Sequence, residues 1–271
     1  MIREPVFAGQ FYPDDPMQLR AEVARCLASE AEGDEAAGEA VAVVVPHAAY
    51  MYSGRIAGAV YATARLPERL VILCPNHTGR GKPVAIMSRG GWRTPLGVAP
   101  IDETLADRIL SRCPMARVDD EAHLREHSLE VQLPFLQVIR QEPRFVPICV
   151  GTTSLPDLVA LGLGLAAAIA DPEGRTGVII STDMSHHLTA DAARAQDMAA
   201  LERIEAIDPE GLHRVVRERA ISMCGIAPAV AGLVAAKSGG ALAARLIAYG
   251  TSGDANGDYA SVVAYAGLAI S

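Results

Sequence analysis

The sequence predicts a single α/β domain with a mixed, mostly parallel sheet flanked by helices. Short apolar runs, many of them β-branched, alternate along the chain with longer segments of helical spacing, and this alternation is typical of βαβ units. Half of the 271 residues are hydrophobic, which is enough to bury both faces of a parallel sheet. Neither an interdomain linker nor an internal repeat interrupts the pattern, so we expect residues 1–271 to form one domain.

Seven apolar runs have the length and composition of strands. Residues 41–45 form a continuous β-branched run that suits a buried parallel strand. Residues 241–249 and 259–266 close the chain, and the Asn256–Gly257 pair between them favours a tight hairpin turn. The other expected strands are residues 69–74, 84–87, 145–150 and 177–182.

The expected helices have apolar residues on one face or are rich in alanine. Ser53 is expected to cap a helix that runs through Tyr61, and Pro134 should kink a helix over residues 129–138 or lie near its start. The polar stretch at residues 30–40 is expected to be a solvated loop. The other expected helices are residues 17–29, 103–112, 158–170, 192–207, 210–219 and 226–237.

Composition and charge exclude several classes of protein. The chain has 24 basic and 32 acidic residues, a net charge of -8 and no Lys/Arg cluster, so we do not expect it to bind nucleic acid. No apolar stretch reaches the roughly 20 residues of a membrane-spanning helix, and the N-terminus lacks the apolar stretch of a signal peptide. We therefore expect a cytoplasmic protein that does not bind membranes. The five cysteines are widely spaced without a C-x-x-C pair, which argues against a disulfide framework and a zinc ribbon.

Three of the expected strands end in side chains that can bind a metal ion. VAVVVPH ends at His47, LVILCPNH ends at His77, and GVIISTDMSHH contains Asp183 and His186. The carboxyl ends of neighbouring parallel strands open into one crevice, which is where such sheets usually bind ligands. Cys224 is a fourth candidate, because it lies in MCGIAP just before an expected helix whose N-terminus would favour a thiolate.

Each of these residues also has a purely structural explanation. A lone histidine after a strand is more often a hydrogen-bonded structural residue, Asp183 could only cap a helix, and Cys224 could be a small core residue. Two histidines in matching positions at strand ends favour a shared metal site, whereas His187 is as readily a solvated turn residue. Glu126 and His127 precede a helix, where an acidic residue is favoured by the helix dipole, so their position alone assigns them no function.

The chain resembles the Memo-like family, the B component of the bacterial AmmeMemoRadiSam system, over nearly its full length. The segments that carry the resemblance are FAGQFYPDDP, PHAAYMYSG, PNHTG, WRTPLG, EHSLEVQLPFL, STDMSHH, MCGIAP and YGTSGD. The family is similar in fold to class III extradiol dioxygenases, which use non-haem Fe(II) to open aromatic rings with O₂. The resemblance implies that fold here, together with a functional partnership with a radical SAM protein and an AMMECR-like protein.

The resemblance also implies a metal site with three ligands and three further residues that line its pocket. The implied ligands are His47, His77 and Cys224, and the implied pocket residues are Asp183, His186 and His127. Ring-cleaving relatives bind iron through two histidines and a carboxylate. Here the third ligand is a thiol, a softer donor, so copper and zinc are alternatives to Fe(II). His187 stands where the family often has tyrosine, and it could add a ligand or a proton carrier.

The function that we expect is Fe(II)-dependent oxidation of a small or peptidyl substrate by O₂. His186 would act as general base, Asp183 would orient His186 or a metal-bound water, and His127 would donate a hydrogen bond to negative charge on oxygen. Two alternatives remain. The pocket could hold a ligand or peptide without turning it over, or Cys224 could act without metal as a nucleophile, with a nearby histidine as its base.

Overall fold

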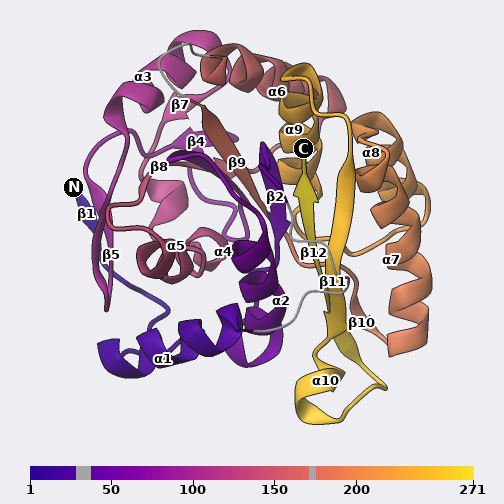
Figure 1. The fold of residues 1–271 in the computed structure, drawn as a ribbon. Helices are drawn as coiled ribbons and strands as arrows, with labels where there is room; N and C mark the ends of the chain where they lie inside the picture. Colours follow the sequence, from indigo (N-terminus) through magenta and orange to yellow (C-terminus); the bar gives the residue numbers. More distant parts are fainter. Residues whose placement is uncertain (29–37, 171–174) are drawn as a thin grey trace.

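The computed structural model describes residues 1–28, 38–170 and 175–271, and a mixed sheet forms its centre (Figure 1). The strand order is β10-β12-β2-β9-β3-β8-β4-β7, and β11 pairs with β12. The prediction of one α/β domain with a mixed sheet is confirmed, while most of the expected loop at residues 30–40 lies outside the described residues. The strands of this sheet are β2 (Ala42–Val45), β3 (Arg69–Pro75), β4 (Val84–Ile86), β7 (Arg117–Val118), β8 (Arg144–Val150), β9 (Thr176–Ser181), β10 (His186–Leu188), β11 (Ala244–Thr251) and β12 (Val262–Ile270).

The four strands in the middle of the sheet, β2, β9, β3 and β8, are parallel. Every residue of β2 and of β9 is buried, which agrees with their continuous apolar sequences. Strands β12 and β4 pair antiparallel with β2 and β8, and the edge strand β7 pairs parallel with β4, so the sheet is mixed on either side of its parallel centre. Because β9 lies between β2 and β3, the carboxyl ends of these three strands lie side by side.

Helices cover both faces of the sheet (Figure 1). Successive residues of β2 face opposite sides of the sheet. Val44 belongs to the hydrophobic cluster on one side, which includes the helices between residues 155 and 238. Val43 and Val45 belong to the hydrophobic cluster on the other side. None of the described helices is long and apolar enough to cross a lipid bilayer. The helices are α1 (Pro16–Leu27), α2 (Tyr50–Thr63), α3 (Glu103–Arg112), α4 (His127–Glu130), α5 (Leu133–Ile139), α6 (Leu155–Ile169), α7 (Ala190–Glu205), α8 (Pro209–Glu218), α9 (Ile226–Ser238) and α10 (Gly253–Asn256).

Two local predictions in this architecture were wrong. Helix α2 begins at Tyr50 rather than after Ser53, and the Ser53 hydroxyl donates to the Ala48 carbonyl instead of capping a helix. Strands β11 and β12 form the expected antiparallel pair, but they are connected through α10 rather than by a tight turn at Asn256–Gly257. Gly257 has a φ of 76° and ends α10, because its amide donates back to a carbonyl one helical turn earlier.

The expected helix over residues 129–138 is split into α4 and α5. Helix α4 ends at Glu130 and α5 begins at Leu133, with Pro134 in its first turn, which is one of the two positions expected for this proline. The break lies next to the site: His127 of α4 packs against the rings of His47 and His77, whereas Glu130 of α4 pairs with Arg3.

A second, three-stranded sheet was not indicated by the sequence. It consists of β1 (Ile2–Arg3), β5 (Gly91–Thr94) and β6 (Gly97–Pro100), in the order β1-β5-β6. These strands are too short for a periodic pattern to reveal them. By pairing with β5, β1 carries the N-terminal segment to α4, next to the carboxyl edge of the main sheet.

Candidate metal centre

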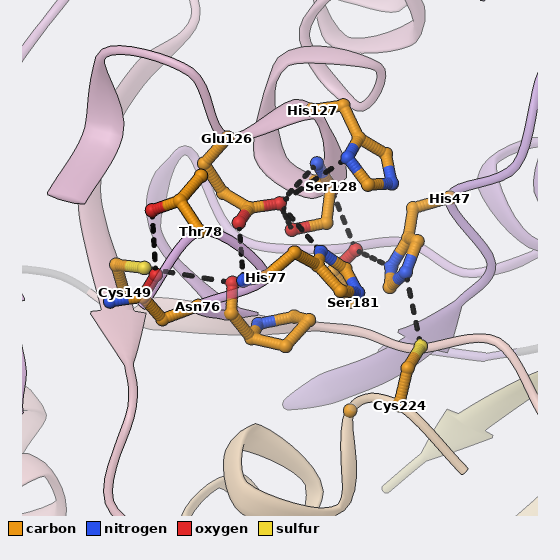
Figure 2. Close-up of polar contacts among 12 residues, drawn as sticks. His47, Asn76, His77, Thr78, Glu126, His127, Ser128, Cys149, Ser181 and Cys224 are labelled. Carbon is orange, nitrogen blue, oxygen red and sulfur yellow. Dashed lines mark hydrogen bonds and ion pairs between the residues drawn. The ribbon is translucent and has the colours of Figure 1, made fainter. Parts of the chain in front are cut away.

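Three neighbouring strands and one helix start bring polar side chains together, and Figure 2 shows His47, His77 and Cys224 among them. We call the surroundings of these side chains the pocket. Strand β2 leads into His47, β3 into His77 and β9 into Asp183, while Cys224 lies just before α9. The ligand atoms of His47, His77 and Cys224 all lie within 4.8 Å of one another. The three residues expected to bind metal therefore come together, although they are far apart along the chain.

Gly225 allows the Cys224 segment to approach the end of β9. A Cβ atom on Gly225 would lie 2.4 Å from the Cβ atom of Thr182, which is too close for any other residue without a shift of the backbone. The Gly225 amide donates to the Thr182 hydroxyl at 3.0 Å. The sulfur of Cys224 consequently lies 3.2 Å from Nε2 of His47 and accepts a hydrogen bond from the Asp183 amide at 3.3 Å.

The hydrogen bonds around Ser181 determine which nitrogen of His47 faces the pocket. The Ser181 hydroxyl donates its one proton to the Ser128 carbonyl, and it accepts a hydrogen bond from the side-chain amide of Gln132. It must therefore accept from Nδ1 of His47 at 2.8 Å, so Nδ1 carries the proton and Nε2 presents a lone pair. Burial, together with the smaller effect of the neighbouring His77, lowers the pKa of His47 to about 3, so the ring is neutral and ready to bind a cation.

Glu126 orients His77 in the same way. Its carboxylate accepts from Nδ1 of His77 at 2.8 Å and from the His77 amide at 2.7 Å, and it also accepts from the amide and hydroxyl of Ser128. Burial alone would raise the pKa of Glu126, but the hydrogen bonds from His77 and Ser128 lower it to about 2. The ionised carboxylate holds the proton on Nδ1 of His77, which leaves Nε2 for a metal ion.

Replacing Glu126 with glutamine is expected to weaken metal binding by roughly 10- to 100-fold, the usual effect of removing a partner that orients a ligand. The neutral amide cannot hold the His77 proton as strongly as the carboxylate does. The measurement is a competition titration against a coloured chelator. Ser128→Ala is the matched control, because it removes one donor to Glu126 and leaves the Glu126–His77 contact in place. Equal affinities of wild type and Glu126→Gln would contradict the assigned role.

The same carboxylate should make the free energy of unfolding depend on pH. The pKa of Glu126 falls from its ordinary value of 4.5 to about 2 in the folded protein. Its contribution to stability is therefore fully present above pH 4.5 and is lost as the pH falls toward 2. Between pH 5 and pH 3, wild type should lose more stability than Glu126→Gln in denaturant titrations.

His127 completes the wall of the pocket. Its ring stacks on that of His77 with centroids 4.7 Å apart, and it packs against Phe11 at 4.7 Å and Phe7 at 5.5 Å. Its Nδ1 is 3.6 Å from the Glu126 carboxylate, which is too long for a hydrogen bond. Burial lowers the pKa of His127 to about 4, so at neutral pH the ring is uncharged and keeps one N–H group to donate.

Asp183 and His186 lie on the other side of the pocket. The Asp183 carboxylate accepts the backbone N–H of His47 at 2.7 Å, which ties the end of β9 to the end of β2. Burial raises the pKa of Asp183. His186 donates its amide to the Ser222 hydroxyl, and its Nδ1 lies 3.0 Å from the Ser222 carbonyl. His187 is exposed and has a φ of 60°, and no group of possible metal ligands among the described residues includes it.

The surroundings of Cys224 favour its neutral thiol, so the prediction that the start of α9 would favour a thiolate was wrong. Burial raises the pKa of Cys224, and the negative charge of Asp183 raises it further. Hydrogen bonds from the Asp183 amide and the Thr182 hydroxyl act in the opposite direction without outweighing these effects. A bound cation is the charge that would turn this thiol into a thiolate. The other four cysteines are buried, as expected for core residues.

The donor set fits a metal ion of intermediate softness. It offers two imidazole lone pairs and one sulfur, and each imidazole has its outer N–H held by an acceptor, as metal-binding histidines usually do. The sequence did not indicate the residues that hold these rings, Glu126, Ser128, Gln132 and Ser181. Glu126 is 49 residues from His77 along the chain, and only its place beside His127 in the EHSLEVQ segment could have drawn attention to it.

Sequence comparisons with known proteins extend over nearly the whole chain. The sequence profile of a family described as "Memo-like protein" matches residues 3–269. A MEMO1 family protein of Methanopyrus kandleri is 41% identical over 278 residues, which cover 99% of this chain and 98% of that protein. MEMO1 family proteins of Methanothermobacter thermautotrophicus and Aquifex aeolicus are each 40% identical, covering 99% and 98% of this chain and 100% and 98% of their own lengths.

Proposed function

The chain belongs to the Memo-like protein family, and from this premise we propose that its pocket binds one metal ion for the oxidation of a small or peptidyl substrate by O₂. The proposed ligands are His47, His77 and Cys224, and the proposed metal is Fe(II), with copper or zinc as alternatives. The observation that carries the proposal is the convergence of these three ligand atoms within 4.8 Å. The outward hydrogen bonds of both imidazoles support it further.

Three protein ligands would leave part of the coordination sphere open for reactants. When bound, a redox-active ion would supply electron transfer between substrate and O₂. The protein provides access from the side of His77, whose side chain is 33% exposed, while the His47 side chain is 2% exposed. We place the substrate on this open side, between His77 and the rings of His127 and Phe11.

The remaining pocket residues have separate roles in the proposed reaction. His186 acts as general base on a substrate hydroxyl or amine. Its Nδ1 is hydrogen-bonded to the Ser222 carbonyl, which leaves Nε2 to accept a proton. Asp183 acts as a positioning residue through its hydrogen bond to the His47 amide. His127, as a neutral imidazole, donates a hydrogen bond to negative charge that develops on a reacting oxygen atom.

We also propose that the protein works together with a radical SAM protein and an AMMECR-like protein. This part rests on the resemblance to the bacterial family alone.

The test measures oxygen uptake by Fe(II)-loaded protein with panels of small phenols, amines and peptides. The protein is handled without air until the assay begins. We expect about one iron per chain and oxygen uptake that requires both iron and substrate. Protein that binds iron or peptide without oxygen uptake would instead be a binding module. Rapid alkylation of Cys224 in a protein that turns over substrate without metal would establish a cysteine enzyme. The raised pKa of Cys224 argues against that last outcome, because the neutral thiol is a poor nucleophile.

A further inference from the structure

A second group of ligand atoms lies beside the first. The Asp183 carboxylate, the His186 ring and the Cys224 sulfur offer atoms that all lie within 4.8 Å of one another. Cys224 therefore belongs both to this group and to the group formed with His47 and His77. Its sulfur lies between two sets of possible metal ligands.

His186 is held as a metal-binding histidine would be held. The Ser222 carbonyl can only accept a hydrogen bond, so the contact of 3.0 Å to Nδ1 places the ring proton on Nδ1. The second contact to Ser222, from the His186 amide to the hydroxyl, fixes the backbone at the same point. The lone pair of Nε2 is thereby free to bind a cation, as it is in His47 and His77.

Asp183 adds a carboxylate to this position, and Cys224 adds a thiol that a bound cation would turn into a thiolate. One oxygen of Asp183 is occupied by the His47 amide, which holds the carboxylate in place, and the Asp183 amide donates to the Cys224 sulfur. A carboxylate and a thiolate side by side repel each other unless a cation lies between them. Because Asp183, His186 and Cys224 offer one oxygen, one nitrogen and one sulfur, they suit Zn²⁺.

We propose that Asp183, His186 and Cys224 form a second metal position, which shares the Cys224 sulfur with the first and binds Zn²⁺ when this ion is in excess. The inference rests on the proposed function, because the first position must bind metal for the sulfur to bridge two ions. Metal ions in such paired sites are typically about 3.5–4 Å apart. Zn²⁺ at this position occupies the lone pair of His186, the proposed general base, and so inhibits the reaction without displacing the metal of the first position.

The test is a Zn²⁺ titration of chelator-treated protein under reducing, anaerobic conditions, followed by calorimetry. Wild type should bind two equivalents, the second more weakly than the first. His186→Ala and Asp183→Asn should each bind one equivalent. His213→Ala is the matched control, because it removes another imidazole, one that contacts the Thr153 carbonyl rather than this pocket, and should keep both equivalents.

The outcomes separate this inference from the proposed function. Wild-type protein that binds a single equivalent, unchanged in His186→Ala but lost in His77→Ala, would overturn the second position and leave the first intact. Two equivalents that persist in both His186→Ala and Asp183→Asn would also overturn it. Wild-type protein that binds no Zn²⁺ would remove the basis of both proposals.

Discussion

Freshly isolated Cys224→Ser and His47→Ala proteins are expected to contain little or no metal where wild type contains about one ion per chain. Each change removes one of three proposed ligands, so affinity should fall by more than the roughly 10- to 100-fold that follows loss of an orienting partner. Serine is close to cysteine in size, but its hydroxyl keeps its proton at neutral pH and is a poor ligand for an ion that prefers imidazole and sulfur. Elemental analysis of the three proteins, purified side by side, is the measurement.

Cys113→Ala is the matched control for the loss of a buried thiol. Cys113 is buried, and its sulfur lies 3.9 Å from the Leu161 carbonyl in α6, outside the candidate centre. This variant should retain the metal content of wild type. If Cys224→Ser also retained it, the sulfur could not be a ligand, and the candidate centre would reduce to its histidines.

The affinity for metal should also rise with pH, and this dependence should require Cys224. Because burial and Asp183 raise the pKa of Cys224, the thiol is protonated across the neutral range and must release its proton when it binds a cation. Release of one proton makes the affinity rise about tenfold per pH unit. The affinity remaining in Cys224→Ser should lack this contribution. A slope that is the same in both proteins would show that the thiol is not the group deprotonated on binding.

The residues at the strand ends could be predicted because their pattern is local. Each of β2, β3 and β9 contains a continuous apolar run, and the polar residues that follow are visible in the sequence. Neighbouring parallel strands then bring His47, His77 and Asp183 to one edge without further information. The same reasoning predicted the helices that cover the sheet, because their apolar periodicity is also local.

The rest of the centre depends on contacts between distant segments. Nothing near Glu126 in the sequence indicates that its carboxylate receives two hydrogen bonds from His77, and nothing near Ser181 indicates that it orients His47. The protonation of Cys224 was mispredicted because the start of α9 is only one of its neighbours. Burial and the carboxylate of Asp183 both raise the pKa of its thiol.

Glu130→Gln is expected to destabilise the protein by about 3–5 kcal/mol, the typical effect of breaking a buried ion pair. The side chains of Arg3 and Glu130 are 1% and 0% exposed, and their charged atoms are 2.5 Å apart. Glu130 also accepts from the Phe7 amide at 2.9 Å and from the Tyr12 hydroxyl at 2.6 Å. The substitution leaves the guanidinium buried without its counter-charge. Denaturant titrations give the free energy of unfolding.

Glu4→Gln is the control for an exposed ion pair. Glu4 contacts Arg93 at 3.0 Å, but its side chain is 65% exposed, so its removal should change stability by less than about 1 kcal/mol. A loss in Glu130→Gln no greater than this would show that the buried pair does not hold the N-terminal segment in place.

A double substitution separates the ion pair from the other contacts of Glu130. Arg3→Met combined with Glu130→Gln removes the uncompensated charge, so the double variant should be more stable than the sum of the single losses predicts. The loss that remains would measure what the Phe7 amide and the Tyr12 hydroxyl contribute through Glu130. Because Phe7 packs against His127, this remainder should be accompanied by a change in the His127 ring environment, visible in its proton NMR signals. Strictly additive losses would mean that Arg3 and Glu130 act independently, which their distance and burial argue against.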